Sequence, residues 1–470
     1  MAVTTAGAGL SSRLDRFFKI TERGSTMRTE LIAGGATWLT MSYILFVNPT
    51  ILGFLGIPDL QSKGLPFGQV LTVTALVAGC MTLLMGIYAN YPFALAAGLG
   101  LNAFVAFTLV AGRGLSYPQA MGVIVVEGLA ITALVLTGFR EAVLNAIPLD
   151  LKRAIGIGIG MFIAFIGFVN AGVVVHPQSG EPIVTINPNL TTLRMLVFVI
   201  GFVITGALVA RRMKGALLGG IVLTTVIGMI INYGWAHKAL WASLPGVGLV
   251  PSKWIQGPDF GLVGKFSFDF FSALGTWTAI AVVLSVMLSD FFDTMGTVVG
   301  IAGEAKLLTP EGKLPGINRV LLVDSLAAAA GGAASASSNT TYIESAAGVS
   351  EGGRTGLTSV VVGVLFLLSL FLSSLAGIIP PEATAPILVI VGYFMMTIVK
   401  DINWQDPGIG IPALLTVVIM PFTFSITNGV GAGFLSYLFI AVLRGKIREV
   451  HPLMWVVSGV FAWYFIHGVV

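Results

Sequence analysis

The stretch Gly331–Gly356, GGAASASSNTTYIESAAGVSEGGRTG, lies between two strongly apolar regions and decides how the chain folds. Its paired glycines favour a break in a helix, and Ser335–Thr341 favour caps and extended backbone. At membrane depth, irregular backbone persists only where protein or a watery cavity satisfies its polar groups. We therefore predict that a half-helix begins near Asn339–Thr341 and that Glu344 lies one turn inside it, facing a binding cavity.

The composition places the whole chain in a membrane. Of its 470 residues, 56% are hydrophobic and 10% are charged, whereas soluble domains hold about 25% charged residues. The net charge of +4 is assigned to basic residues that flank helices, not to nucleic-acid binding. The one cysteine, Cys80, excludes a disulfide and a cysteine metal site. Neither a metal nor a cofactor is predicted. Met1–Glu30 lacks the apolar core of a cleavable signal peptide, so the first membrane helix is expected to act as an uncleaved signal.

The apolar runs predict an inverted repeat. They divide the chain into about fourteen membrane elements, half of them before Trp241. An odd number in each half gives the halves opposite orientations. The interrupted elements, Asn90–Asn102 and Gly331–Gly356, come third and tenth, and such matching interruptions point to a transporter's binding site. The last run, Leu453–Val470, either crosses the membrane or lies in its interface. Basic clusters put the N-terminus in the cytoplasm; they are Met1–Arg28, Arg140 with Lys152 and Arg153, Arg211–Lys214 and Arg444–Arg448.

Several carboxylates fall in apolar runs, and each is expected to face protein or water because exposure to lipid is costly. They are Glu127, Asp290, Asp293, Asp324 and Glu344. Asp290 and Asp293 are three residues apart on one helix face, so repulsion should make one hold its proton to higher pH, which suits proton coupling. The alternative is that one of them only hydrogen-bonds opened backbone. Glu127 and Asp324 are interpreted mainly as structural partners of the broken backbone.

Side chains near the two interruptions are candidates for substrate contact. Glu344 is a candidate ligand-binding carboxylate, although Thr341–Glu344 also fits a capping box in which the glutamate caps its own helix. Asn102 offers a donor and an acceptor in the mirrored element. Tyr342 and Phe104 each offer a ring face, against the alternative that both only pack.

Three motifs carry a resemblance to a known family. They are SDFFDTMGTVVG at Ser289–Gly300, NTTYIESAAGVSEGGRTGLTS at Asn339–Ser359 and AAGLGLNAF at Ala96–Phe104. They resemble the xanthine/uracil permease superfamily, the nucleobase–ascorbate transporters, and most of all its AzgA-like branch for hypoxanthine, adenine and guanine. The uracil and xanthine branches commonly have Glu at the position of Asp290, so only the purine branch fits closely.

The resemblance implies an all-α polytopic fold of two inverted repeats of seven transmembrane segments, with short strands at broken segments 3 and 10. It also implies a core domain and a gate domain. The boundaries expected on this basis are a cytoplasmic tail at 1–29, core parts at 30–140 and 274–380, gate parts at 151–235 and 383–447, an extracytoplasmic connection at 236–273 and a C-terminal apolar helix at 448–470.

The resemblance further implies a secondary transporter, not an enzyme, that imports purine bases by proton symport and an elevator movement. Asp290 and Glu344 would bind the base, with Asn102, Tyr342 and Phe104 nearby, and Asp293 would serve proton coupling together with Asp290 and Glu344. The protein would be a homodimer in a bacterial inner membrane, with lipid, protons and a purine as partners and no nucleic acid.

Other functions remain open at this point. A carrier of uracil, xanthine or a small anion could use the same fold, although acids at the centre argue against an anion. An intramembrane aspartyl protease normally takes its two aspartates from separate spans, whereas Asp290 and Asp293 share one. A channel usually needs repeated subunits around a pore.

Overall fold

The computed structural model describes residues 4–137, 147–175, 184–242, 244, 247–250, 255–309, 314–372 and 378–467. Within them, eight helices are long and apolar enough to cross a membrane, judged by length and composition. Shorter apolar helices add to these; they are Leu99–Gly112, Thr276–Phe291, Gly356–Leu372, Pro407–Phe422 and Pro452–Ile466. Arg140, which contributes to the predicted orientation, lies outside the described residues.

The elements of the first half precede residue 235. They are α1 (Thr4–Phe18), α2 (Met27–Met41), α3 (Ile44–Leu52), α4 (Pro58–Gln61), α5 (Phe67–Leu84), η1 (Met85–Ala89), β1 (Leu95–Ala97), α6 (Leu99–Ala103), η2 (Phe104–Gly112), α7 (Tyr117–Thr137), α9 (Leu149–Asn170), β2 (Val174–Val175), β3 (Thr185–Ile186), α10 (Leu193–Ala210) and α11 (Ala216–Gly234). Here η1 and η2 are π-helical turns that continue α5 and α6.

The elements of the second half follow residue 269. They are α12 (Phe270–Leu274), α13 (Thr276–Glu304), α14 (Ile317–Ala333), β4 (Asn339–Thr341), α15 (Ser345–Ser350), α16 (Gly356–Leu368), η3 (Ser369–Leu372), α18 (Pro381–Met396), η4 (Thr397–Asp401), α19 (Pro407–Phe422), α20 (Ile426–Leu443), η5 (Ile447–Glu449) and α21 (Pro452–His467).

These elements form two sets of seven membrane segments within the described residues. The first set is α2–α3, α5–η1, β1–α6–η2, α7, α9, α10 and α11; the second is α13, α14, β4–α15, α16–η3, α18–η4, α19 and α20. Of these, α14 and β4–α15 are not among the apolar helices named above. The strand-bearing segment is third in each set, which confirms the predicted inverted arrangement. The final helix, α21, packs on α20 and α13.

The two interrupted segments meet through their strands. β1 pairs with β4 in an antiparallel register that sets Leu95 opposite Thr341 and Ala97 opposite Asn339. The prediction that a half-helix begins near Asn339–Thr341 is therefore wrong, because these residues are strand and α15 begins only at Ser345. Pairing with β1 satisfies their backbone groups, so extended backbone is stable there. The strands implied by the family resemblance are confirmed.

The paired glycines do not make the break. Gly331 and Gly332 lie inside α14, and the irregular backbone follows them, with Ser335 and Ser337 at φ of 61° and 72°. Left-handed backbone at a non-glycine residue is strained and persists where the surroundings hold it. A Cβ atom on Gly331 would lie 2.0 Å from the carbonyl oxygen of Ser337. This glycine is thus needed so that the chain can fold back onto α14.

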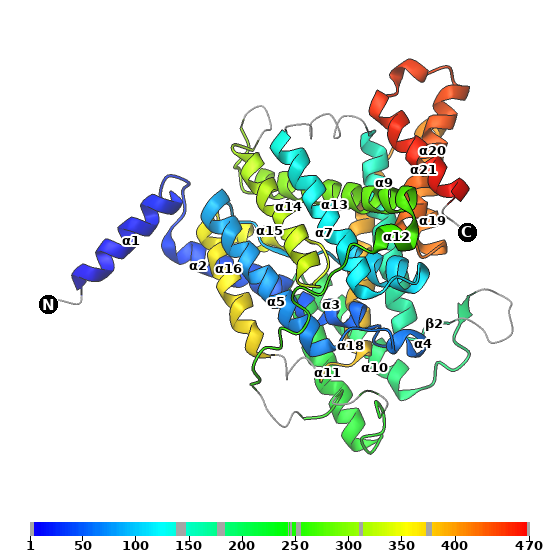
Figure 1. Ribbon diagram of the computed structural model, residues 1–470. Helices are drawn as coiled ribbons and strands as arrows, with labels where there is room; N and C mark the ends of the chain where they lie inside the picture. Colours follow the sequence, from blue (N-terminus) through cyan, green and yellow to red (C-terminus); the bar gives the residue numbers. More distant parts are fainter. Residues whose placement is uncertain are drawn as a thin grey trace.

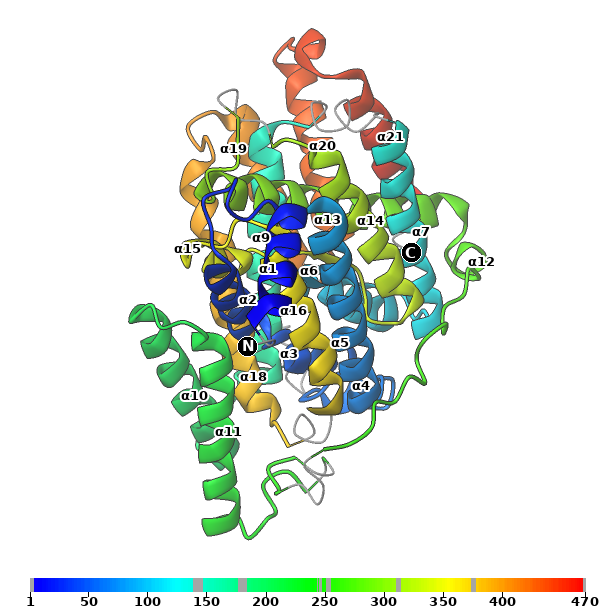
Figure 2. The same cartoon turned by 90° about the vertical axis from the view of Figure 1, so that its left-hand side faces the viewer.

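The helices pack as two groups. In one group α7 packs on α14, α5 on α16, and α2 on both α15 and α16; in the other α9 packs on α18 and α19, and α10 on α11. Figure 1 shows α1 extending away from the bundle, and Figure 2 shows α10 and α11 side by side at its edge. We call these the α7/α14 group and the α9/α18 group. They meet where α6 contacts α9 and α3 contacts α18.

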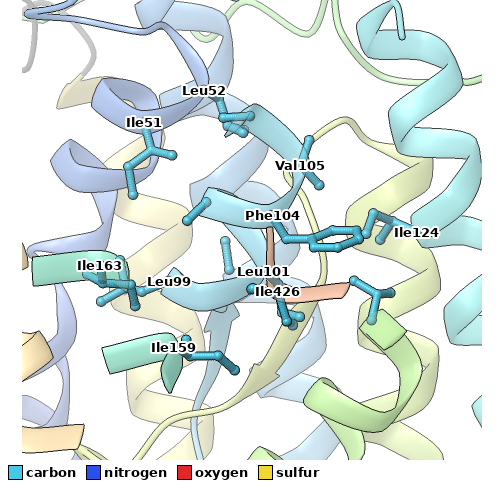
Figure 3. Packing of buried hydrophobic residues seen from close by; sticks show 14 of the residues in the cluster. Ile51, Leu52, Leu99, Leu101, Phe104, Val105, Ile124, Ile159, Ile163 and Ile426 are labelled. Atoms are coloured by element: carbon cyan, nitrogen blue, oxygen red, sulfur yellow. The ribbon is translucent and has the colours of Figure 1, made fainter. Parts of the chain in front are cut away.

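The third segment is buried at the centre of this packing. Figure 3 shows Leu99, Leu101 and Phe104 among side chains from α3, α7, α9 and α20. Phe104 has no exposed surface, and its ring lies beside Ile124 (Figure 3). Because lipid tails are as apolar as these side chains, the stabilisation comes from close van der Waals packing, not from removal from water.

Candidate functional site

A cavity of about 600 Å³ lies between the two helix groups. The α7/α14 group gives it a polar wall, with contributions from Tyr43, Asp293, Thr340, Thr341, Tyr342 and Glu344. The α9/α18 group gives it a largely apolar wall, with contributions from Ile155, Gly156, Ile159, Val391, Phe394 and Met395. At the start of α9 the cavity also reaches Lys152 and Arg153. The cavity thus presents hydrogen-bonding groups on one side and an apolar surface on the other.

Glu344 lies at the N-cap of α15 and lines the cavity. The hydroxyl of Tyr43 donates to its Oε1 at 2.7 Å. The capping-box interpretation is wrong, because Glu344 makes no side-chain cap bond and the N–H of Thr341 donates to Asp324 instead. The carboxylate is therefore oriented into the cavity by a distant part of the chain and not by its own helix.

Asp290 and Asp293 have different surroundings although they share α13. Asp293 is exposed and lines the cavity. Asp290 is 1% exposed, and the hydroxyl of Ser338 donates to it and to Glu127, at 3.3 Å in each case. The shared Ser338 hydroxyl therefore joins Asp290 to Glu127. The partner of Asp290 is thus Glu127 on α7, rather than Asp293.

The remaining predicted residues divide between the cavity and the protein interior. Tyr342 lines the cavity, and its hydroxyl donates to the carbonyl of Ala97 on β1 at 2.5 Å. Asn102 is fully buried, and neither its side-chain oxygen nor its nitrogen has a partner among the described residues. Asn102, Phe104 and Asp290 are not among the described residues that line the cavity.

Asp324 acts as the predicted structural partner of the broken backbone. Both the N–H and the hydroxyl of Thr341 donate to it, and so does the hydroxyl of Thr294. It therefore holds the end of β4 against α13 and α14.

Sequence reasoning missed two kinds of site residue. Tyr43 was missed because a tyrosine within an apolar run suggests packing, although a buried Tyr hydroxyl usually needs a partner. Lys152 and Arg153 were interpreted only as orientation signals. Arg153 lies 3.0 Å from Asp150 and also donates to the carbonyl of Asp401.

Two inverted sets of seven segments, strands that pair at their interruptions and a cavity beside those strands define a multi-pass membrane transport protein. The chain belongs to the xanthine/uracil permease family, whose profile, described as a permease family, matches residues 28–431.

The relatives with known names are permeases of nearly the same length. A guanine/hypoxanthine permease of Bacillus subtilis is 39% identical over 451 residues, which is 96% of this chain and 99% of that protein. An adenine permease of Escherichia coli K12 is 40% identical over 457 residues, which is 97% of this chain and 96% of that protein.

Solved structures share the fold at low identity. The transmembrane domain of the cyanobacterial bicarbonate transporter BicA superposes with a TM-score of 0.60 at 15% identity, covering 87% of this chain and 97% of that one. The murine anion transporter Slc26a9 in its inward-facing state gives 0.62 at 11% identity, covering 89% of this chain and 69% of that one. At these identities the likeness concerns the fold alone.

Proposed function

We propose that the protein imports purine nucleobases, with hypoxanthine, guanine and adenine as substrates. The observation that carries this proposal is the two-sided cavity, polar where β4 and α15 line it and apolar where α9 and α18 do. The relatives named as guanine/hypoxanthine and adenine permeases support the same substrate class.

The chemistry of a purine matches such a cavity. The base is flat, uncharged and edged with N–H donors and ring acceptors. Glu344 and Asp293 can accept from its N–H groups, Tyr342 offers an aromatic face, and the apolar wall covers the other face of the ring. The proposed site also includes Asp290, Asn102 and Phe104, which are buried next to the residues that line the cavity. An anion is a poorer fit beside Glu344 and Asp293, because the two cations among the described residues that reach the cavity, Lys152 and Arg153, lie at the start of α9.

We propose proton symport as the source of energy. Asp293 and Glu344 line the cavity, where protonation can accompany substrate binding, and Asp290 lies one layer deeper beside Glu127. Protonation of a carboxyl group adds an O–H donor and removes the negative charge. The protonation state of the group is therefore coupled to the base that it contacts. Uptake should weaken when the proton gradient is collapsed with an uncoupler, and uptake that is insensitive to the uncoupler would remove this part of the proposal.

We propose that the α7/α14 group is the core domain and the α9/α18 group the gate, with the boundaries given by the family resemblance. The core would move against the gate in an elevator movement. The ring of Phe107, in the proposed core, contacts the rings of Phe162 and Phe424, in the proposed gate, with centroids 6.5 and 6.2 Å apart. Phe162 lies further along α9 than Arg153. These contacts support an arrangement in which core and gate are packed together at the Phe162 end of α9.

The N-terminus would lie in the cytoplasm of a bacterial inner membrane, and the exposed α10–α11 hairpin would form the interface of a homodimer.

Uptake in cells that lack their own purine carriers tests the substrate. Radiolabelled hypoxanthine, guanine or adenine should enter saturably, and the same three bases without label should compete. Preferred competition by uracil or xanthine would move the assignment to another nucleobase. If no nucleobase accumulates or competes while another solute does, the proposal fails.

A further inference from the structure

Tyr43 occupies a break in the first membrane segment, directly against the proposed binding carboxylate. It lies between α2 and α3, is 1% exposed, and lines the cavity. Its hydroxyl is 2.7 Å from Oε1 of Glu344. We infer that Tyr43 is a positioning residue for substrate binding: its hydroxyl occupies Oε1 of Glu344 and so leaves Oε2 to accept from an N–H of the base. The inference rests on the proposed function.

The backbone around Tyr43 fixes where its side chain starts. Helix α2 ends at Met41, and the N–H of Ser42 still donates to the carbonyl of Trp38 at 2.8 Å. The carbonyl of Tyr43 then accepts from the N–H groups of Phe46 and Val47, at 3.0 Å each, as α3 begins. Backbone hydrogen bonds on both sides of Tyr43 therefore present its side chain from a defined turn.

Close contact between α2 and α15 fixes where Glu344 lies relative to Tyr43. A Cβ atom on Gly348 of α15 would lie 2.2 Å from the hydroxyl oxygen of Thr37 and 2.6 Å from the carbonyl of Ala33, both on α2. One turn further along α2, the hydroxyl of Thr40 lies 3.4 Å from the carbonyl of Glu344. Because the two backbones touch, the bond between the side chains of Tyr43 and Glu344 follows from helix packing.

The bond has a consequence for binding affinity. A free glutamate samples many rotamers, and a ligand that immobilises it must overcome that entropy. Tyr43 restricts Glu344 before the base arrives, so less ordering remains to be done at the binding step. While Glu344 is ionised, its oxygens only accept, so the Tyr43 hydroxyl is the donor. A charge-assisted hydrogen bond of this kind is stronger than a neutral one.

A purely structural role predicts a different outcome. Glu344 is partly exposed to the cavity, so water can replace the lost hydroxyl in a Tyr43→Phe variant. The matched control is Tyr117→Phe, because Tyr117 is also buried and donates to a backbone carbonyl, that of Leu52. Tyr117 is not among the described residues that line the cavity. Its hydroxyl serves the fold, because it connects α7 to the last residue of α3, whose carbonyl also accepts from the N–H of Leu65.

The experiment measures purine-induced thermal stabilisation and uptake for the full-length wild type and both variants. For Tyr43→Phe we expect a dissociation constant for hypoxanthine raised about tenfold, as loss of a hydrogen bond to a charged group predicts. Its melting temperature without purine should match the wild type. Tyr117→Phe should lower the melting temperature and leave the dissociation constant unchanged.

A second variant tests the same bond from the other side. Glu344→Asp keeps a carboxylate but withdraws it from Tyr43, so it should also weaken binding, and the double variant should lose little more than either single one. Additive losses, or a Tyr43→Phe dissociation constant equal to that of the wild type, would overturn the inference. If Tyr43→Phe does not insert, unchanged affinity in Glu344→Asp overturns it alone. A wild type that binds no purine at all would instead refute the proposed function.

Discussion

Thr341 donates both its backbone N–H and its hydroxyl to one oxygen of Asp324, at 2.8 and 2.7 Å. The second oxygen of Asp324 accepts from the hydroxyl of Thr294 at 2.7 Å. One buried carboxylate thereby connects β4 with α13 and α14, at the point where β4 turns into the segment that carries Glu344. The polar wall of the cavity depends on this carboxylate although Asp324 does not line it among the described residues.

Replacing Asp324 by alanine should destabilise the protein. The buried N–H of Thr341 would lose its acceptor, and an unsatisfied buried donor costs about 1–3 kcal/mol. We expect a lower melting temperature in detergent and weaker purine binding, because β4 is no longer held. Asp324→Asn retains an acceptor and should lose less of both.

The control for this prediction is Glu22→Ala, which removes an exposed ion pair with Lys19. Surface pairs contribute about 0–1 kcal/mol, so this variant should resemble the wild type. An Asp324→Ala protein as stable as Glu22→Ala would contradict the role given to Asp324.

Gly156 should limit the size of the substrate. It lines the cavity, and a Cβ atom there would meet only Ile398, at 3.8 Å. Gly156→Val should therefore fill cavity space without disturbing the helix packing. A pocket change of only one methylene alters discrimination roughly 10–200-fold, and Gly156→Val adds three carbon atoms. Competition by purines with bulky substituents should therefore fall more than competition by hypoxanthine.

The neighbouring glycines provide the comparison. A Cβ atom on Gly160 would lie 2.6 Å from Cβ of Met395, so Gly160→Val should destabilise the protein. At Gly206 nothing lies within 4 Å, and Gly206→Val should change neither stability nor selectivity. Equal effects of the Gly156 and Gly206 variants on competition would show that Gly156 does not limit substrate size.

Gly100 and Ile159 should behave as a compensating pair. A Cβ atom on Gly100 of α6 would lie 2.4 Å from Cγ2 of Ile159 on α9, across the boundary between the two helix groups. Gly100→Ala should therefore slow uptake by forcing the groups apart, with a cost of about 1–3 kcal/mol. Adding Ile159→Ala should restore part of the rate, because it removes the clashing methyl group. Rates that do not recover in the double variant would place the defect elsewhere.

The sequence predicted the general architecture because composition alone reveals interruptions. Polar and glycine-rich runs stand out in an apolar chain, and their equal positions in the two halves follow from counting. The kind of interruption could not be read in this way. Thr340 and Thr341 suit a strand or a helix start, and the choice depends on pairing with Leu95–Ala97, far away in the chain.

The site was only partly predictable for a related reason. Helical spacing puts Asp290 and Asp293 on one face but does not reveal their neighbours. In the structure Asp290 shares the Ser338 hydroxyl with Glu127, while Asp293 lines the cavity. Tyr43 approaches Glu344 from a segment about 300 residues earlier, so its role depends on tertiary packing that spacing cannot reveal.

The most direct test of purine binding at Glu344 is equilibrium binding of hypoxanthine, guanine and adenine to the purified wild type and to Glu344→Ala. We expect saturable binding of a purine to the wild type and loss of this binding in Glu344→Ala, with the variant still inserted and folded. Purine binding that is undiminished in Glu344→Ala would contradict this expectation.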